Sequence, residues 1–182
     1  GVYLSDNTNL SAFSENTFGG NGGAPLSVPS SRLGQLDAAS DYAGDTLESP
    51  NDDNFIQARR STIERAQTWS ATNVPMRLSG ETYIELGDAS EAVSIDAGAT
   101  LEFDDGAGIR VNNGAFNAIG TSDSIITFTG AVETAGFWEA LVFNSNNPAN
   151  ELAFTEIAYG GKGGSFGFTG STETMVLVTD DS

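Results

Sequence analysis

The side chains best suited to chemistry in this chain are three pairs of adjacent aspartates. They are Asp52-Asp53, Asp104-Asp105 and Asp180-Asp181. Calcium takes about six to eight oxygen ligands, so neighbouring carboxylates beside turn carbonyls are suitable ligands for it. Asp104-Asp105 is the best candidate metal site, because it lies in the most regular part of the chain. Solvated acidic turns are the alternative interpretation of all three pairs.

The residue types that are missing narrow the chemistry further. Histidine and cysteine do not occur among the 182 residues, which excludes histidine acid–base catalysis, cysteine nucleophiles and typical zinc sites. The sequence contains neither a phosphate-binding loop nor a dinucleotide fingerprint. We therefore predict no catalytic residues and no required cofactor, with calcium as the one ion that the carboxylates are suited to bind.

Two aromatic residues are candidates for binding a ligand. Trp138 and Tyr159 are suited to form a surface on which sugar rings stack. Trp138 follows Phe137, so one of these two side chains points outward if the segment is a strand. Packing in the core is the alternative role for Trp138 and Tyr159.

The charge balance restricts the partners of the protein. Acidic residues number 25 and basic residues 7, for a formal net charge of −18. Such a surface repels nucleic acid and anionic membranes, and Arg59-Arg60 is too small for a basic patch. No apolar run approaches the roughly 20 residues of a membrane helix. We expect neither nucleic acid binding nor membrane insertion. An acidic extracellular protein, adaptation to high salt in a halophilic or marine source, and loading with divalent cations all fit this composition.

A repeated unit positions these side chains. Between residues 76 and 130, short segments of alternating apolar and polar residues each end in a glycine, at positions 80, 87, 98, 106, 114, 120 and 130. The repeat is about eight residues long, and three repeats make a rung of about 24 residues or more. Alternation points every second side chain inward. The pattern predicts an all-β fold, a single-stranded parallel β-helix.

The segments can be laid over one another in three strand columns. The first column contains Ile84-Glu85-Leu86, Ile109-Arg110-Val111, Leu141-Val142-Phe143 and Val176-Leu177-Val178. The second column contains Val93-Ser94-Ile95, Phe116-Asn117-Ala118 and Phe154-Thr155-Glu156. The third column contains Leu101-Glu102-Phe103, Ile126-Thr127-Phe128 and Phe166-Gly167-Phe168.

The columns predict two ladders of side chains. The first is an aromatic ladder formed by Phe103, Phe128 and Phe168. The second is an amide ladder at a turn, in which Asn112 or Asn113 lies near Asn144 or Asn146. Asparagine is suited to such a turn, because it tolerates left-handed backbone and bonds neighbouring amides.

We expect a single domain over residues 1–182. Residues 1–29 form an irregular first rung, residues 30–53 a projecting loop with a helical turn, and residues 54–182 the stacked rungs. Residues 54–69 suit either a helix or strands, and strands are favoured because rungs lie on both sides. Strand-like segments reach both ends without a cap, which predicts a part of a longer solenoid or of an assembly.

The repeat resembles that of a known family. The matching segments are residues 93–103, 106–111, 114–121, 125–130, 137–143 and 155–161. They resemble the right-handed parallel β-helix repeat of secreted and cell-surface microbial proteins, the pectate-lyase-like superfamily. The resemblance is best over residues 76–161. It implies a right-handed coil and an extracellular or cell-surface location, and it specifies fold more than function, since the family includes polysaccharide lyases, glycosidases and adhesins.

These observations lead to two functional hypotheses. The first is a non-catalytic, acidic, structural or adhesin-like segment outside the cell, which stacks end to end into a filament or continues into further rungs. The missing catalytic groups and the open ends favour it. The alternative is a carbohydrate-active domain that binds or cleaves an acidic polysaccharide with calcium. If this is an enzyme, we expect a polysaccharide lyase or a glycoside hydrolase.

Overall fold

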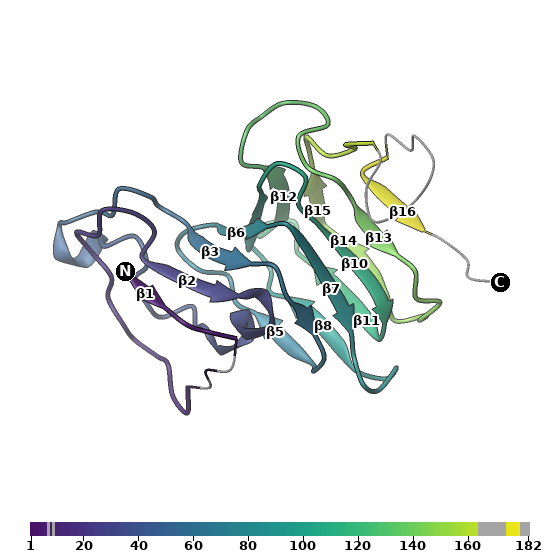
Figure 1. The fold of residues 1–182 in the computed structure, drawn as a ribbon, viewed down its shortest axis with the longest axis horizontal. Coiled ribbons are helices and arrows are strands. Elements are labelled where there is room, and N and C mark those ends of the chain that lie inside the picture. Colours follow the sequence, from purple (N-terminus) through teal and green to yellow (C-terminus); the bar gives the residue numbers. More distant parts are fainter. Residues whose placement is uncertain (7, 9, 164–173, 179–182) are drawn as a thin grey trace.

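Strands dominate the computed structural model, which describes residues 1–6, 8, 10–163 and 174–178. They form three sheets in which every pairing is parallel (Figure 1). Helical structure in these residues is limited to two short 3-10 helices, η1 (Ser30–Gln35) and η2 (Asp45–Leu47). In the ranges just given, no helix is long and apolar enough to cross a bilayer. The prediction of an all-β fold is confirmed.

The chain visits the three sheets in a constant order. The seven-stranded sheet has the order β1 (Val2–Tyr3), β2 (Leu26–Pro29), β3 (Ile56–Arg59), β6 (Met76–Ser79), β9 (Thr100–Phe103), β12 (Ile126–Gly130) and β15 (Thr155–Ile157). The five-stranded sheet has the order β16 (Val176–Val178), β13 (Leu141–Phe143), β10 (Gly108–Asn113), β7 (Glu81–Glu85) and β4 (Thr62–Ile63). The four-stranded sheet has the order β14 (Glu151–Ala153), β11 (Ala115–Ile119), β8 (Ala92–Ile95) and β5 (Gln67–Trp69). From β3 onward each strand pairs with the strand three places along, an arrangement compatible with a parallel β-solenoid.

Alternation along the strands builds the core that the three sheets share. In β9, Leu101 and Phe103 are fully buried, whereas Thr100 and Glu102 are partly exposed. Phe103 also stacks on Trp138, with ring centroids 4.3 Å apart. Buried apolar side chains from all three sheets meet in one large cluster. A period of two therefore sets the inward face of each strand, as expected for strands with one buried face.

The observed registers confirm part of the predicted overlay. Ile109 pairs with Leu141, and Leu141 pairs with Val176, as predicted for the first column. Val93 and Phe116 also pair as predicted in the second column. In these strands, the residues placed over one another from the sequence are true neighbours in space.

Other predicted registers were wrong by two residues. Phe128 pairs with Leu101 instead of Phe103, so these two phenylalanines do not form the predicted ladder. Likewise Ile84 pairs with Val111 instead of Ile109. A shift of two residues keeps the same side chains on the buried face, so the alternation of the sequence is equally satisfied by both registers.

The prediction that Phe154-Thr155-Glu156 continues the second column was also wrong. That column continues in β14, where Glu151 pairs with Asn117. Phe154 adopts a left-handed backbone with φ of 49° and leaves 61% of its surface exposed, so the chain turns there into β15. The predicted segment Phe166-Gly167-Phe168, and with it Phe168 of the aromatic ladder, lies outside the described residues.

Residues 54–69 form three strands, as favoured from the sequence. They are β3, β4 and β5, and each enters a different sheet. Ile56, Ile63 and Trp69 point from them into the core, with at most 1% of their surface exposed. Residues with fair helical propensity are thus strands here, because pairing with the following strands outweighs that preference.

The segment over residues 30–53 is attached to the core at several points. Leu33 and Tyr42 are fully buried in the main cluster, and the centroids of the stacked Tyr42 and Phe18 rings lie 5.5 Å apart.

The carboxylate of Asp41 holds the turn at η2. It accepts hydrogen bonds from Thr46 Oγ1, from the backbone N–H groups of Gly44 and Thr46, and from the Asn73 side chain. These bonds, those from Thr46 first, lower the pKa of Asp41 well below its usual value.

We predict that Asp41→Asn makes the protein less stable at neutral pH and less sensitive to acid. A carboxylate whose pKa is lowered by folding stabilises the native state above the usual Asp value of about 4, and that contribution is lost as the pH falls further. Urea unfolding at neutral and acidic pH should show a difference in the free energy of unfolding between wild type and variant, and this difference should narrow below about pH 4. Asp45→Asn, which removes a neighbouring exposed carboxylate, is the control. A constant gap at all pH values would contradict the prediction.

We predict that Phe128→Ala lowers the free energy of unfolding by about 3–5 kcal/mol, because a buried aromatic ring leaves a cavity. Phe128 is fully buried and its ring lies 6.3 Å from that of Phe116. Ile125→Ala is the control, since Ile125 is 47% exposed. Equal stability of the two variants in urea denaturation would show that Phe128 does not pack as described.

Candidate functional site

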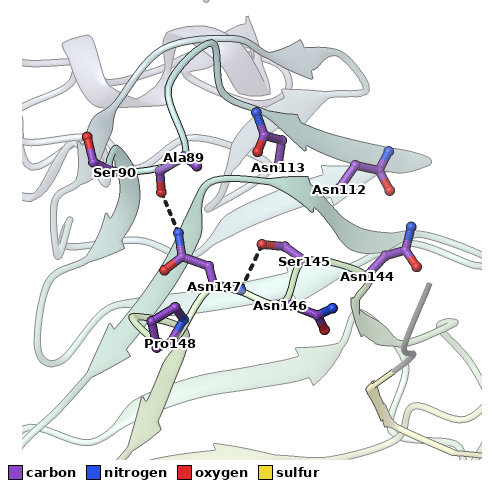
Figure 2. A pocket seen from close by; sticks show the side chains of 9 residues that line it. All are labelled: Ala89, Ser90, Asn112, Asn113, Asn144, Ser145, Asn146, Asn147 and Pro148. Carbon is purple, nitrogen blue, oxygen red and sulfur yellow. Dashed lines mark hydrogen bonds between the residues drawn. The ribbon is translucent and has the colours of Figure 1, made fainter. Parts of the chain in front are cut away.

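A pocket lined mainly by asparagines lies beside the turns that follow strands of the five-stranded sheet (Figure 2). Its volume is about 520 Å³. The lining residues are Ala89, Ser90, Asn112, Asn113, Asn144, Ser145, Asn146, Asn147 and Pro148. The predicted proximity of Asn112 or Asn113 to Asn144 or Asn146 is confirmed.

Parallel pairing brings these turns together. Val111 of β10 pairs with Phe143, the last residue of β13, and the Asn144 N–H donates to the Val111 carbonyl at 2.9 Å. The turn after β10 passes through Gly114, which has φ of 84°. A Cβ at that position would also lie 2.5 Å from Leu86 Cδ1. A glycine is therefore required for the chain to leave β10 and enter β11.

The side chains of the pocket bond from one turn to another. Asn113 Nδ2 donates to the Leu86 carbonyl, and Asn147 Nδ2 donates to the Ala89 carbonyl. Ser145 Oγ donates to the Gly114 carbonyl at 2.8 Å. Three side chains thus satisfy carbonyl groups of other turns, which would otherwise lack partners in this irregular region.

Asn150 extends this set of bonds toward the four-stranded sheet. Its Oδ1 accepts from the Phe116 N–H and its Nδ2 donates to the Ser145 carbonyl, each at 2.9 Å. One side chain thereby holds the start of β11 and the turn after β13. The pocket is neutral and polar, and several of its amides are engaged in holding turns together. Its lining residues carry amides and the hydroxyls of Ser90 and Ser145, and none of them is acidic or basic.

The structure brings Trp138 and Tyr159 close together, with Trp138 buried. The Phe137 N–H donates to the Tyr159 carbonyl at 2.9 Å, and Trp138 Nε1 donates to the Ala158 carbonyl at 2.7 Å. Trp138 is fully buried and stacks on Phe103, whereas Tyr159 is partly exposed. The indole therefore has no face open to a sugar ring, and of the pair Tyr159 alone reaches the surface.

Asp104 and Asp105 lie in different surroundings. Burial raises the pKa of Asp104, although nearby Arg77 and a hydrogen bond from Gln57 act in the opposite direction. Asp105 is mostly exposed and forms an ion pair with Lys162. Over the parts of the chain that the structure describes, no group of three or more acidic side chains is arranged to hold a metal ion.

Arginines that are far apart in the sequence line a second polar site. A groove of about 730 Å³ lies between η1 and the segment that carries β4 and β5. Its lining includes Arg32, Arg60 and Arg65, three of the seven basic residues of the chain. Sequence reasoning missed this site because it considered only the adjacent Arg59-Arg60. The available signal was the clustering of four of the seven basic residues between positions 32 and 65.

Comparisons with known proteins found no matching family model, no matching curated protein and no matching solved structure. The interpretation of this chain therefore depends on its own residues and geometry. Among these, the parallel sheets are compatible with the family resemblance of the sequence.

We predict that Asn150→Ala lowers the free energy of unfolding by about 1–3 kcal/mol, because it leaves the Phe116 N–H without its acceptor. Urea denaturation measures this loss. Asn54→Ala is the control, since Asn54 is an exposed asparagine away from these turns. An effect of Asn150→Ala no larger than that of the control would contradict the structural role of the amide.

Proposed function

We propose that this chain is a segment of a right-handed, single-stranded parallel β-helix with a non-catalytic, structural or adhesive function outside the cell. Support comes from the constant order in which the chain visits three parallel sheets. The hydrogen bonds between asparagine-rich turns also favour a structural role. In this proposal the segment acts through its ends, which pair with another copy or with further rungs.

The main support is the end of the fold formed by β14, β15 and β16. These strands lie at the edges of their sheets, and no described strand pairs with their outer sides. The inward residues Leu152, Ile157 and Val176 are only partly buried. The residues that pair with them one layer inside, Ala118, Phe128 and Leu141, have at most 1% of their surface exposed.

A further layer of strands on this end would bury apolar surface and satisfy backbone groups. Val178 is 75% exposed. A hollow of about 400 Å³ is lined in part by Phe143, Leu152, Val176 and Val178. Open strand edges of this kind are templates for pairing with another chain, and stacking of repeats is what buries a solenoid core.

The alternative, a carbohydrate-active domain that uses calcium, has weaker support. Trp138 is buried, and the carboxylates of Asp104 and Asp105 lie in different surroundings. A site for cleavage also requires an acid and a base or nucleophile at a common point, and the polar pocket described above offers mainly amides.

Sedimentation velocity over a range of protein concentrations tests the proposal. Salt of about 0.5 M should favour association, because it screens the repulsion between acidic copies. We expect the wild type to form chains of copies under these conditions. Leu152→Lys or Ile157→Lys should weaken association about tenfold or more, since each loses the burial of a large apolar side chain.

Val132→Lys is the matched control, because Val132 is 51% exposed in the connection between β12 and β13 and does not belong to an edge strand. It should associate like the wild type. A wild type that stays monomeric at every concentration and salt level would contradict self-stacking. Equal loss of association in all three variants would indicate a general effect of charge instead of pairing at the edge strands.

A further inference from the structure

The arginine-lined groove is unusual in a chain with 25 acidic and 7 basic residues. Its lining consists of Asp6, Ser31, Arg32, Gly34, Gln35, Arg60, Ser61, Thr62, Ile63, Glu64, Arg65, Ala66 and Gln67. The set contains three arginines and two acidic residues, whereas the chain as a whole carries a formal charge of −18. The groove is therefore a local region of positive charge on an acidic protein.

Hydrogen bonds hold the two walls of the groove together. The Ser31 N–H donates to Ser61 Oγ at 2.8 Å, and the Gly34 N–H donates to Gln67 Oε1 at 3.0 Å. Gln67 Nε2 in turn donates to the Ser30 carbonyl at 3.2 Å. Helix η1 is thereby fixed against β5, and the groove between them is formed before any ligand arrives.

Arg32 has donor capacity that the protein does not use. Its Nη2 donates to the Asp6 carbonyl at 3.1 Å, but its Nε is buried and has no hydrogen-bond partner among the described residues. A buried donor without a partner is costly, and more so when it belongs to a charged group. Arg32 lines the groove, so an oxyanion bound there would give its guanidinium group a further acceptor.

The other two arginines are available at the rim. Arg60 and Arg65 are exposed. The salt bridges of the described residues are formed by Arg59, Arg77 and Lys162, and none involves Arg32, Arg60 or Arg65. Most basic residues outside this groove thus form ion pairs with carboxylates of the protein. The three arginines that line the groove form no ion pair among the described residues, so they can pair with an external anion.

We propose that this groove binds an oxyanion group of a ligand: a sulfate, a phosphate or a carboxylate. The guanidinium group presents several N–H donors in a planar fork that matches such oxygens and often binds two at once. The hydroxyl of Thr62 in the lining adds a neutral donor. The partner is a ligand with a few charges and not an extended polyanion such as nucleic acid, because the surrounding acidic surface repels a long negative chain. This site is independent of the strand edges that carry the proposed function.

The salt dependence of the affinity for an oxyanion should distinguish binding at the arginines from a general electrostatic attraction to the protein. At low ionic strength of about 0.01 M, screening acts only beyond about 30 Å, so the whole acidic surface repels the anion. At about 0.1 M the screening length falls to about 10 Å, which weakens distant repulsion more than contact with the arginines. Affinity should therefore be higher at about 0.1 M salt than at about 0.01 M.

NMR of the arginine Nε–H signals in the intact chain tests the proposal, with sodium sulfate, phosphate and acetate as separate probes and sodium chloride at equal ionic strength as the reference. We expect the Arg32 Nε–H signal and the backbone amides of residues 60–67 to shift and saturate with at least one oxyanion. The three probes distinguish which oxyanion the site prefers. Shifts that stay linear, or that chloride reproduces, would overturn the proposal.

Arg32→Gln should weaken binding about tenfold or more, since it removes charge-assisted hydrogen bonds. Arg65→Gln changes an exposed residue, so it should leave folding intact. It should weaken oxyanion binding less than Arg32→Gln does, but measurably. Arg110→Gln is the matched control, because it removes the same charge on the outer side of β10, and it should bind like the wild type. Equal weakening by Arg110→Gln and the groove variants would also overturn the proposal, as it would indicate a response to net charge alone.

Discussion

Parallel hydrogen bonding between each strand and the strand three places along the chain is the constraint on which this structure depends. The strands are two to six residues long, and strands this short do not form stable sheets alone. Pairing in register places buried side chains of successive layers over one another, as Ile109, Leu141 and Val176 show. The shared core and the asparagine-lined turns follow from this pairing.

Surface charge pairs contribute less to the fold than the backbone and the core. Arg77 pairs with Glu102 across β6 and β9, with Nη2 2.7 Å from Oε2, and its guanidinium lies over the Phe55 ring at 3.6 Å. Ion pairs near the surface contribute little net stability. Their main effect here is to place opposite charges in register and to reduce repulsion on the outer face of an acidic protein.

The sequence was sufficient to predict features with a local cause. Alternation identified most strands, the rungs on both sides favoured strands over residues 54–69, and the asparagines after Val111 and Phe143 indicated the amide-rich turns. Register was predicted less well, because a shift of two residues, as between Phe128 and its predicted partner Phe103, leaves the buried face unchanged. The burial of Trp138 and the meeting of Arg32 with Arg65 depend on segments that only the folded chain brings together.

The edge strands combine an apolar inner side with acidic outer residues, and this combination limits how they can pair. Leu152 and Ile157 favour contact with a further layer, whereas Glu151 and Glu156 on the same two strands are exposed. Charged residues on edge strands are a common protection against indiscriminate pairing. Two copies that met through this same end would bring like charges together, so the proposed chains of copies join this end to the opposite end of the next copy. In that proposal the edge carboxylates disfavour pairing of two like ends, and the apolar side chains supply the affinity once a compatible strand is in place.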